Sequence, residues 1–192
     1  MYEIRLANEQ DLVYISKIHK SSYSKIHFTS YFSLDLTEKY YSYFINNKDS
    51  KIFVLTKNEE FLGFIVCGEN ISKQLTLFKK EQRLEILKTA ILNPWVVSKK
   101  IITSVFNKFF DIQTNFNETN FLILSIVSSG QEKGLGSLLL EHLKNYGLKN
   151  GINKIGLYVR ISNISAINAY LKNGYKIVGY TSGQYYMEQN NL

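Results

Sequence analysis

The chain is 192 residues long, with 45% hydrophobic and 20% charged residues, a balance typical of a globular protein of one domain. Its single cysteine, Cys67, excludes an internal disulfide framework. One Cys and three scattered His residues fit no zinc spacing, so no metal site is expected. No apolar run is long enough to span a membrane, and a reducing, cytoplasmic setting is the simplest expectation.

Lys and Arg outnumber Asp and Glu by 23 to 16, which gives a formal net charge of +7. The surplus is concentrated between Lys73 and Lys108, where eight basic residues are opposed by only two acidic ones. Such a segment favours an anionic partner, which could be a phosphate, a nucleic acid or an acidic membrane surface. A solvated helix face explains the same pattern without any partner.

The N-terminal part of the chain, 1–71, indicates a strand, two helices and a hairpin. Alternation of apolar and polar residues over 2–6 predicts a strand, and the apolar spacing from Leu12 to Tyr23 predicts a helix capped by Asn8 or Asp11. The aromatic segment 27–32 is expected to be a loop, and a second helix is expected from Asp35. Apolar runs at 51–56 and 61–67, separated by a polar turn, predict a β-hairpin.

Residues 72–120 are expected to form a helical insert. Leu84, Leu87 and Ile91 fall at helical spacing, and the only proline, Pro94, stands at a position that favours a helix start. Two helices are therefore predicted, with an apolar stripe that runs on from Trp95. We expect most of this stripe to pack on the core. If it is buried against a second copy instead, an isologous two-fold dimer is expected.

The C-terminal part of the chain, after the insert, alternates strands and helices. Strands are predicted at 121–127, 155–159, 175–180 and 185–188, and helices at 134–149 and 165–172, the second of which ends at Gly174. This alternation predicts an α/β or mixed-sheet layered fold.

The segment most informative about chemistry is Ser128-Ser129-Gly130-Gln131-Glu132-Lys133-Gly134-Leu135-Gly136-Ser137, which joins a strand to a helix. Gly134 and Gly136 carry no Cβ, so a ligand can approach the backbone closely. The unpaired N–H groups of the first helical turn then form an anion site suited to a phosphate or pyrophosphate. A Walker loop and a dinucleotide fingerprint are both excluded, because Lys133 precedes Gly134 and position 139 is leucine.

Two motifs in this region resemble the GNAT superfamily of acyl-CoA-dependent N-acyltransferases. The first is Gln131-Glu132-Lys133-Gly134-Leu135-Gly136 after the strand 123–127, and the second runs from Asn163 through Ala166 and Tyr170 to Gly174-Tyr175. The resemblance covers 121–188 well, the part of the chain before the insert more loosely, and the insert not at all.

The resemblance implies a mixed, largely antiparallel central sheet flanked by helices, with the two-helix insert placed before the cofactor-binding strand. It implies one domain over 1–192, with the insert at 72–120 and the cofactor-binding core at 121–188. The activity implied is transfer of an acetyl or other short acyl group from CoA to a primary amine. The cofactor implied is therefore acetyl-CoA or another short acyl-CoA.

The resemblance also implies residue roles. Backbone groups of Ile126 and Val127 would bind the pantetheine arm as an added strand, Asn163 would bond the same arm, and an amide near this strand would stabilise the oxyanion. Tyr170 would contact the cofactor and act as general acid toward the thiolate. The pyrophosphate would be held by the amides of Gln131, Glu132, Lys133, Gly134, Leu135, Gly136 and Ser137.

Two departures from the family pattern concern charge and the general base. Glu132 stands where glycine is common, and its carboxylate must point away from a bound pyrophosphate. The strand 121–127 carries no acidic residue, so the base is either a water relay or a residue from elsewhere. The candidates are Glu69, Glu118, His19 and His27, of which His27 is favoured because it lies in the aromatic loop on the acceptor side.

The acceptor is expected to be a small-molecule amine that carries negative charge. No nucleic-acid partner and no membrane span are expected. The best hypothesis is the amino group of a nucleotide-linked amino sugar in bacterial surface polysaccharide synthesis, by analogy with related enzymes. A protein or peptide N-acetyltransferase and a non-enzymatic module that binds nucleic acid or membranes remain as alternatives. The residues considered as aromatic lining of the acceptor pocket are His27, Phe28, Tyr31, Phe32, Tyr40, Tyr41 and Trp95.

Overall fold

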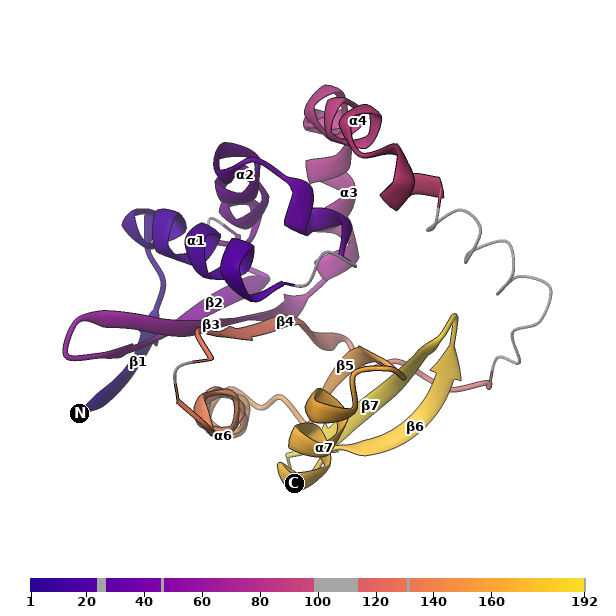
Figure 1. Cartoon of the computed structure of the whole chain (residues 1–192). Helices are drawn as coiled ribbons and strands as arrows, with labels where there is room; N and C mark the ends of the chain where they lie inside the picture. Colours follow the sequence, from indigo (N-terminus) through magenta and orange to yellow (C-terminus); the bar gives the residue numbers. More distant parts are fainter. Residues whose placement is uncertain (24–26, 46, 99–113, 131, 192) are drawn as a thin grey trace.

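The computed structural model describes residues 1–23, 27–45, 47–98, 114–130 and 132–191. Seven strands in this part of the chain form one sheet in the order β1-β2-β3-β4-β5-β7-β6 (Figure 1). The strands are β1 (Tyr2–Leu6), β2 (Ser50–Lys57), β3 (Glu60–Glu69), β4 (Phe121–Ser128), β5 (Lys154–Arg160), β6 (Lys176–Thr181) and β7 (Gln184–Asn190). The helices are α1 (Leu12–Ser22), α2 (Leu34–Ile45), α3 (Ile71–Glu81), α4 (Arg83–Leu92), α6 (Leu135–Lys149) and α7 (Ile164–Lys172), with short 3-10 turns at Glu9–Asp11 and Phe28–Tyr31.

All neighbouring strands pair antiparallel except β4 and β5, which are parallel. The predicted hairpin is present as β2 and β3, and the strands and helices predicted after the insert are present with small differences at their ends. The mixed, largely antiparallel sheet flanked by helices is therefore confirmed. The predicted loop at 27–32 differs in one respect, because residues 28–31 form a 3-10 turn.

Both faces of the sheet are covered by helices. On β2, Ile52 and Val54 belong to the core beneath α1 and α2, whereas Phe53 and Leu55 belong to the core shared with α6. Figure 1 shows α1 and α2 on one side of the sheet and α6 and α7 on the other. Burial on both faces explains why β2, β3 and β4 are continuous apolar runs rather than alternating ones.

The 3-10 turn Glu9–Asp11 that leads into α1 is fixed by a capping box and an ion pair. The side chain of Asn8 accepts a hydrogen bond from the amide of Gln10, and the carboxylate of Asp11 accepts one from the Asn8 amide in a capping box. Arg5 of β1 forms a bidentate ion pair with Asp11, at 2.7 and 2.8 Å. The Arg5 guanidinium lowers the pKa of Asp11, which is buried. This ion pair holds the first turn of α1 against the edge of the sheet.

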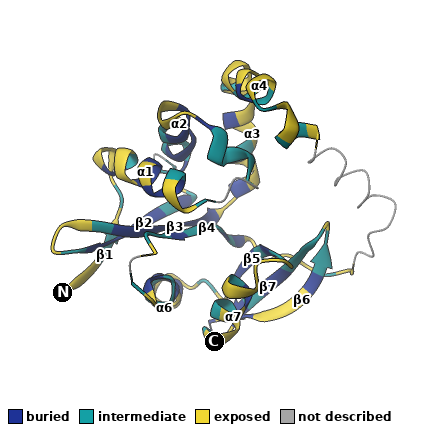
Figure 2. Ribbon diagram, in the orientation of Figure 1, coloured by how far each residue is buried: buried dark blue, intermediate teal, exposed yellow. Residues whose placement is uncertain are grey.

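The insert differs from its prediction in two ways. It contains a helix, α3, that the sequence did not separate, followed by α4 and a helical stretch at 94–98. Most of the predicted apolar stripe does not pack on the core: Leu84 of α4 is 70% exposed and Trp95, beyond α4, is 78% exposed, whereas Ile86 of α4 packs against the core. Figure 2 shows α4 as the outermost and most exposed described helix. The stripe beyond Trp95 at 99–113 lies outside the described residues. No helix in the described ranges is both long and apolar enough to cross a membrane.

Candidate active site

The strands β4 and β5 separate in the middle of the sheet. In the described residues their ladder contains two pairs, Leu122 with Gly156 and Ile123 with Leu157. The register of β3 against β4 shifts at the same point, since Val66 pairs with Ser125 and Cys67 with Ile123, which leaves Leu124 as an extra residue. A bulge of this kind bends the strand that carries it. Beyond Ile123, β4 therefore has an edge that β5 does not pair.

The open part of β4 leads directly into the glycine-containing loop and then into α6 (Figure 1). Gly130 and Gly134 have positive φ values of 75° and 89°, which side chains with a Cβ adopt at a cost. A Cβ built on Gly134 or on Gly136 would meet no atom within 4 Å. The first turn of α6 thus presents its backbone N–H groups to an open cradle, which has the properties of an anion site.

The predicted loop residues occupy different environments. Leu135 is buried in the core, so only its backbone faces the cradle. Lys133 is exposed. Ser137 accepts a hydrogen bond of 2.9 Å from the side chain of Asn173, just beyond the C-terminus of α7, which links α6 to α7. Gln131 lies outside the described residues.

Glu132 points away from the cradle. Its carboxylate forms an ion pair of 2.7 Å with Lys57 at the end of β2 and accepts a hydrogen bond from the hydroxyl of Tyr2. These contacts lower the pKa of Glu132, with Lys57 as the larger cause. The charge that was unfavourable beside a pyrophosphate is therefore directed to the edge formed by β1 and β2.

The second predicted motif forms α7 and its ends. Asn163 is the N-cap of α7, and its side-chain oxygen accepts a hydrogen bond of 3.3 Å from the Ala166 amide. Tyr170 is half-buried near the end of this helix, with its ring centroid 5.8 Å from that of Tyr175. Burial raises the pKa of Tyr170 to about 12, so its phenol is protonated and able to donate near neutral pH.

Two of the four candidate bases, His19 and His27, lie against Tyr23, and the two glutamates lie elsewhere. Glu69 pairs with Phe121 at the far end of β4, away from the loop. Glu118 accepts a hydrogen bond from the hydroxyl of Tyr158 on β5. His27 contacts Tyr23 edge-to-face, with 4.9 Å between the ring centroids. His19 is buried in α1, where Nδ1 lies 2.7 Å from the Tyr41 hydroxyl.

Three residues near the separation of β4 and β5 were not proposed as catalytic from the sequence. Tyr23 ends α1, Tyr41 lies on α2, and Ser125 lies on β4. The tether from Ser22 Oγ to the Ser128 carbonyl, 3.0 Å long, holds the end of α1 over the end of β4. The one available signal was Ser125, because it is the only polar residue inside the strand run 121–127.

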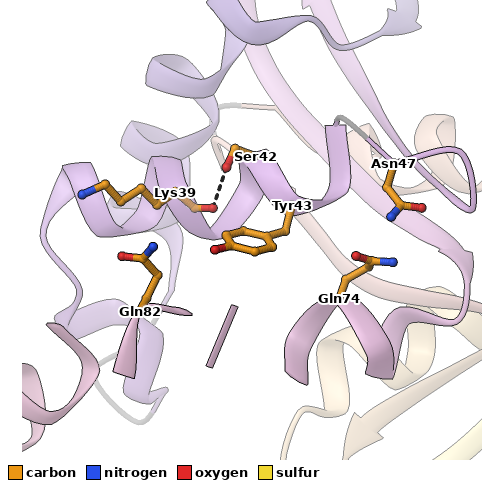
Figure 3. Close-up of a pocket in the computed structure, with 6 residues that line it drawn as sticks. All are labelled: Lys39, Ser42, Tyr43, Asn47, Gln74 and Gln82. Carbon is orange, nitrogen blue, oxygen red and sulfur yellow. Dashed lines mark hydrogen bonds between the residues drawn. The ribbon is translucent and has the colours of Figure 1, made fainter. Parts of the chain in front are cut away.

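The described basic residues of α3 and α4 lie far from the cradle. At the end of β3 that leads to α3, Glu69 pairs with Phe121 of β4. At the other end, where β4 runs into the loop, Gly63 pairs with Ser128. Lys79, Arg83 and the basic residues near them on α3 and α4 are therefore not placed to hold a pyrophosphate at the loop. Figure 3 shows a hollow of about 410 Å³ that is lined by polar side chains of α2, of α3 and of the residues that follow them. Its lining residues are Lys39, Ser42, Tyr43, Asn47, Gln74 and Gln82.

The aromatic lining expected for the acceptor is only partly available. Phe32, Tyr40 and Tyr41 are buried in the core beneath α1 and α2. Trp95 lies on the exposed helical stretch after α4. Only His27, Phe28 and Tyr31, which are partly exposed, remain in a position to meet a ligand from solvent.

Comparisons with known proteins agree with this geometry. A model of the Acetyltransferase (GNAT) family matches residues 110–175, about a third of the chain. The "Probable N-acetyltransferase san" of Drosophila melanogaster is 35% identical over 77 residues, which cover 40% of this chain and 41% of that protein. The aligned part thus spans about two fifths of the length of this curated relative.

Solved structures resemble the whole chain at low identity. The PaiA N-acetyltransferase of Thermoplasma acidophilum, solved with coenzyme A, has a TM-score of 0.63 at 17% identity and covers 99% of both chains. A spermidine N-acetyltransferase SpeG chimera of Vibrio cholerae and hSSAT also has a TM-score of 0.63, at 16% identity, and covers 99% of this chain and 95% of that one. The chain has the fold of these acetyltransferases, and the family model adds a sequence match over about a third of the chain.

Proposed function

We propose that the protein is an acyl-CoA-dependent N-acyltransferase that moves an acetyl or other short acyl group to a primary amine. One observation carries the proposal: an unpaired edge of β4 leads directly into an open helix N-terminus. An extended pantetheine arm can bond such an edge as an added strand, and the amides of the helix start can hold the pyrophosphate that follows it. The proposal treats 1–192 as one domain in a cytoplasmic setting.

The chain supplies the following roles. Ile126 and Val127 bond the pantetheine arm through their backbone groups, and the amides from 131 to 137 hold the pyrophosphate. The side chain of Asn163 bonds the arm from the start of α7. A backbone amide of the open β4 edge stabilises the oxyanion that forms when the amine attacks the thioester. Tyr170 donates its phenolic proton to the departing sulfur.

The proposed acceptor is the amino group of a nucleotide-linked amino sugar used in bacterial surface polysaccharide synthesis. The net charge of +7 supports an anionic acceptor, and the partly exposed aromatic rings at 27–31 offer stacking surface for a base or a sugar. His27 is the sequence-based candidate for the group that takes the proton of the amine. Its ring neighbour Tyr23 is the competing candidate.

A second acceptor is favoured by one feature of the insert. The described helices α3 and α4 pack beside α2 and do not cover the separation of β4 and β5 (Figure 1). A site that these helices leave open could admit an extended chain, which a protein or peptide N-acetyltransferase requires. The two acceptor classes share a primary amine and the same CoA site.

The proposal is tested by measuring thiol release from acetyl-CoA in the presence of amines. We expect turnover with a nucleoside-diphosphate amino sugar, such as UDP-glucosamine, to exceed turnover with a short peptide that has a free N-terminus. The reverse order would assign the peptide class. Absence of both turnover and CoA binding would refute acyl transfer, and steeply salt-dependent binding of DNA or acidic vesicles would then support the non-enzymatic alternative.

A further inference from the structure

A cluster of buried polar groups lies where the end of α1 meets α2 and β4. His19 Nδ1 lies 2.7 Å from the Tyr41 hydroxyl, and both side chains are almost fully buried. The Tyr23 ring stacks on the His19 ring with 4.1 Å between centroids and 15° between planes. Tyr23 itself is half-buried. The pair His19–Tyr41 therefore fixes the Tyr23 ring, part of which stays exposed.

Ser125 brings a hydroxyl from β4 to the same place. Its Oγ is shielded from solvent and makes no hydrogen bond of normal geometry with any residue that the structure describes. It nevertheless lowers the pKa of both the Tyr23 and the Tyr41 phenols, so it lies close to each of them. A shielded hydroxyl without a partner is destabilising, and a bound ligand would remove that penalty by completing the hydrogen bond.

The charge state of the cluster is neutral near pH 7. Burial lowers the pKa of His19 to about 4, with Lys20 and His27 as smaller causes. Burial raises the pKa of Tyr23 to about 12. Tyr23 contacts the rings of His19 and His27, and Ser125 of β4 lowers its pKa. A charge on Tyr23 would in turn raise the pKa of Tyr40 and Tyr41 of α2 and of Tyr170 of α7.

A neutral, partly desolvated site binds a free amine better than an ammonium ion. The ammonium would lose its hydration without gaining a charged partner from these phenols and imidazoles. A free amine can accept a hydrogen bond from one hydroxyl and donate to another. Tyr23 follows α1 in the core on one face of the sheet, and Tyr170 of α7 belongs to the core on the other face. A charge on Tyr23 would raise the pKa of Tyr170.

We propose, on the basis of the acyl transfer proposed above, that Tyr23 and Ser125 bind a weakly basic primary amine as its free base and that Tyr23 is the catalytic residue that receives its proton. The amine nitrogen forms a bond to the thioester carbon, and the carbon–sulfur bond then breaks. Tyr170 gives its proton to the sulfur. Tyr23 takes the surplus proton of the amine and releases its own phenolic proton to solvent, and Tyr170 regains a proton from solvent, so both phenols end neutral.

This assignment specifies the acceptor class and replaces the need for an acidic residue on β4. An amino sugar or the α-amine of a peptide is largely unprotonated at slightly alkaline pH, whereas an alkyl amine such as a lysine side chain is not. His27 contacts Tyr23 by its ring edge, which makes it a wall of the acceptor site. The assignment separates the roles of Tyr23 and His27, which the sequence could not do.

The test compares Tyr23→Phe with His27→Gln and with Tyr14→Phe. Tyr23→Phe keeps the ring that stacks on His19 and removes only the oxygen, and Tyr14 is an exposed tyrosine on the same helix. CoA affinity, measured first by calorimetry, should be unchanged in all three. With glucosamine and alaninamide as acceptors, kcat/KM should fall about 100-fold or more in Tyr23→Phe, less than 10-fold in His27→Gln, and not at all in Tyr14→Phe.

Ser125→Ala keeps the proposal testable if Tyr23→Phe is poorly folded. Removing a hydroxyl that has no partner should leave the melting temperature equal or higher, while kcat/KM falls at least 10-fold. Wild-type enzyme should prefer alaninamide and glucosamine to cadaverine. The assignment would be overturned by unimpaired turnover in Tyr23→Phe or by a larger loss of kcat/KM in His27→Gln than in Tyr23→Phe. A preference of the wild type for cadaverine, or no turnover of either weakly basic amine, would overturn it as well. Failure of the wild-type protein to bind CoA would instead refute acyl transfer itself.

Discussion

Gly136 offers a substitution whose effects on stability and on ligand binding should have opposite signs. It is the second residue of α6, and a Cβ at this position would meet no atom within 4 Å. Alanine favours a helix over glycine by roughly 0.5–1 kcal/mol. Gly136→Ala should therefore stabilise the ligand-free protein by about that amount. For a protein of this size the melting temperature should rise by roughly 1–4 °C.

The same methyl group should weaken CoA binding. It projects into the cradle at the start of α6, where the proposal places the pyrophosphate, and displaces the phosphate oxygens from the backbone N–H groups. A hydrogen bond to a charged group contributes roughly 1.5–3 kcal/mol, so loss of one bond raises the dissociation constant by roughly 10- to 100-fold.

The assay is thermal unfolding without ligand, followed by calorimetric titration with CoA. Asn145→Ala is the matched control, because Asn145 is exposed on α6 well away from the loop and alanine also has the higher helix propensity there. The control should gain stability without a change in CoA affinity. A Gly136→Ala protein that melts higher and binds CoA like the wild type would refute the placement of the pyrophosphate.

Gly134→Val should abolish CoA binding and leave the fold intact, because the φ of 89° at this position imposes strain but no atom lies in the way of a Cβ. Gly151→Val is the control, with a φ of 69° and equally open space, and should lose similar stability while it keeps its affinity for CoA. Equal CoA affinities in the two variants would contradict the site. Tyr170→Phe should lower kcat by about 100-fold or more and CoA affinity by less than twofold; an equal fall in both would remove Tyr170 from the role of general acid. Burial lowers the pKa of His19 in the folded protein to about 4, against an ordinary 6.5. Its contribution of about 3 kcal/mol to the free energy of unfolding is therefore present above pH 6.5 and is lost as the pH falls to 4. Urea unfolding should show a smaller loss of stability over that range in His19→Gln than in the wild type, and identical losses would contradict the burial of a neutral imidazole.

Much of the sheet was predictable because its strands are buried on both faces. The runs around Phe53, Phe64 and Ile123 contain almost no polar residue, and turn residues separate them, so local pattern and global fold agree. The glycine-containing loop before α6 was predictable as a turn for a related reason, since Gly134 adopts a conformation that favours glycine.

The acceptor side was less predictable because it depends on tertiary register. The extra residue Leu124 in β4 changes which side chains follow the strand to each face. The next residue, Ser125, lowers the pKa of Tyr23 and of Tyr41. Periodicity in the sequence cannot locate a bulge of this kind.

The insert was mispredicted in its packing because an apolar helical stripe does not specify what covers it. Leu84 and Leu87 have the spacing of core residues and are nevertheless exposed on α4. The partners of Glu132 could not be predicted either, because Lys57 and Tyr2 are distant from it in the sequence and meet the loop only in the folded sheet.

The central claim is that the cradle formed by the open β4 edge and the start of α6 binds CoA. Its most direct test is calorimetric titration of the wild-type protein with CoA and with pantetheine, which lacks the pyrophosphate. We predict stoichiometric binding of CoA at least 100-fold tighter than that of pantetheine, because the helix N-terminus holds the anionic part. Equal affinity for the two ligands, or no binding of CoA, would contradict the account.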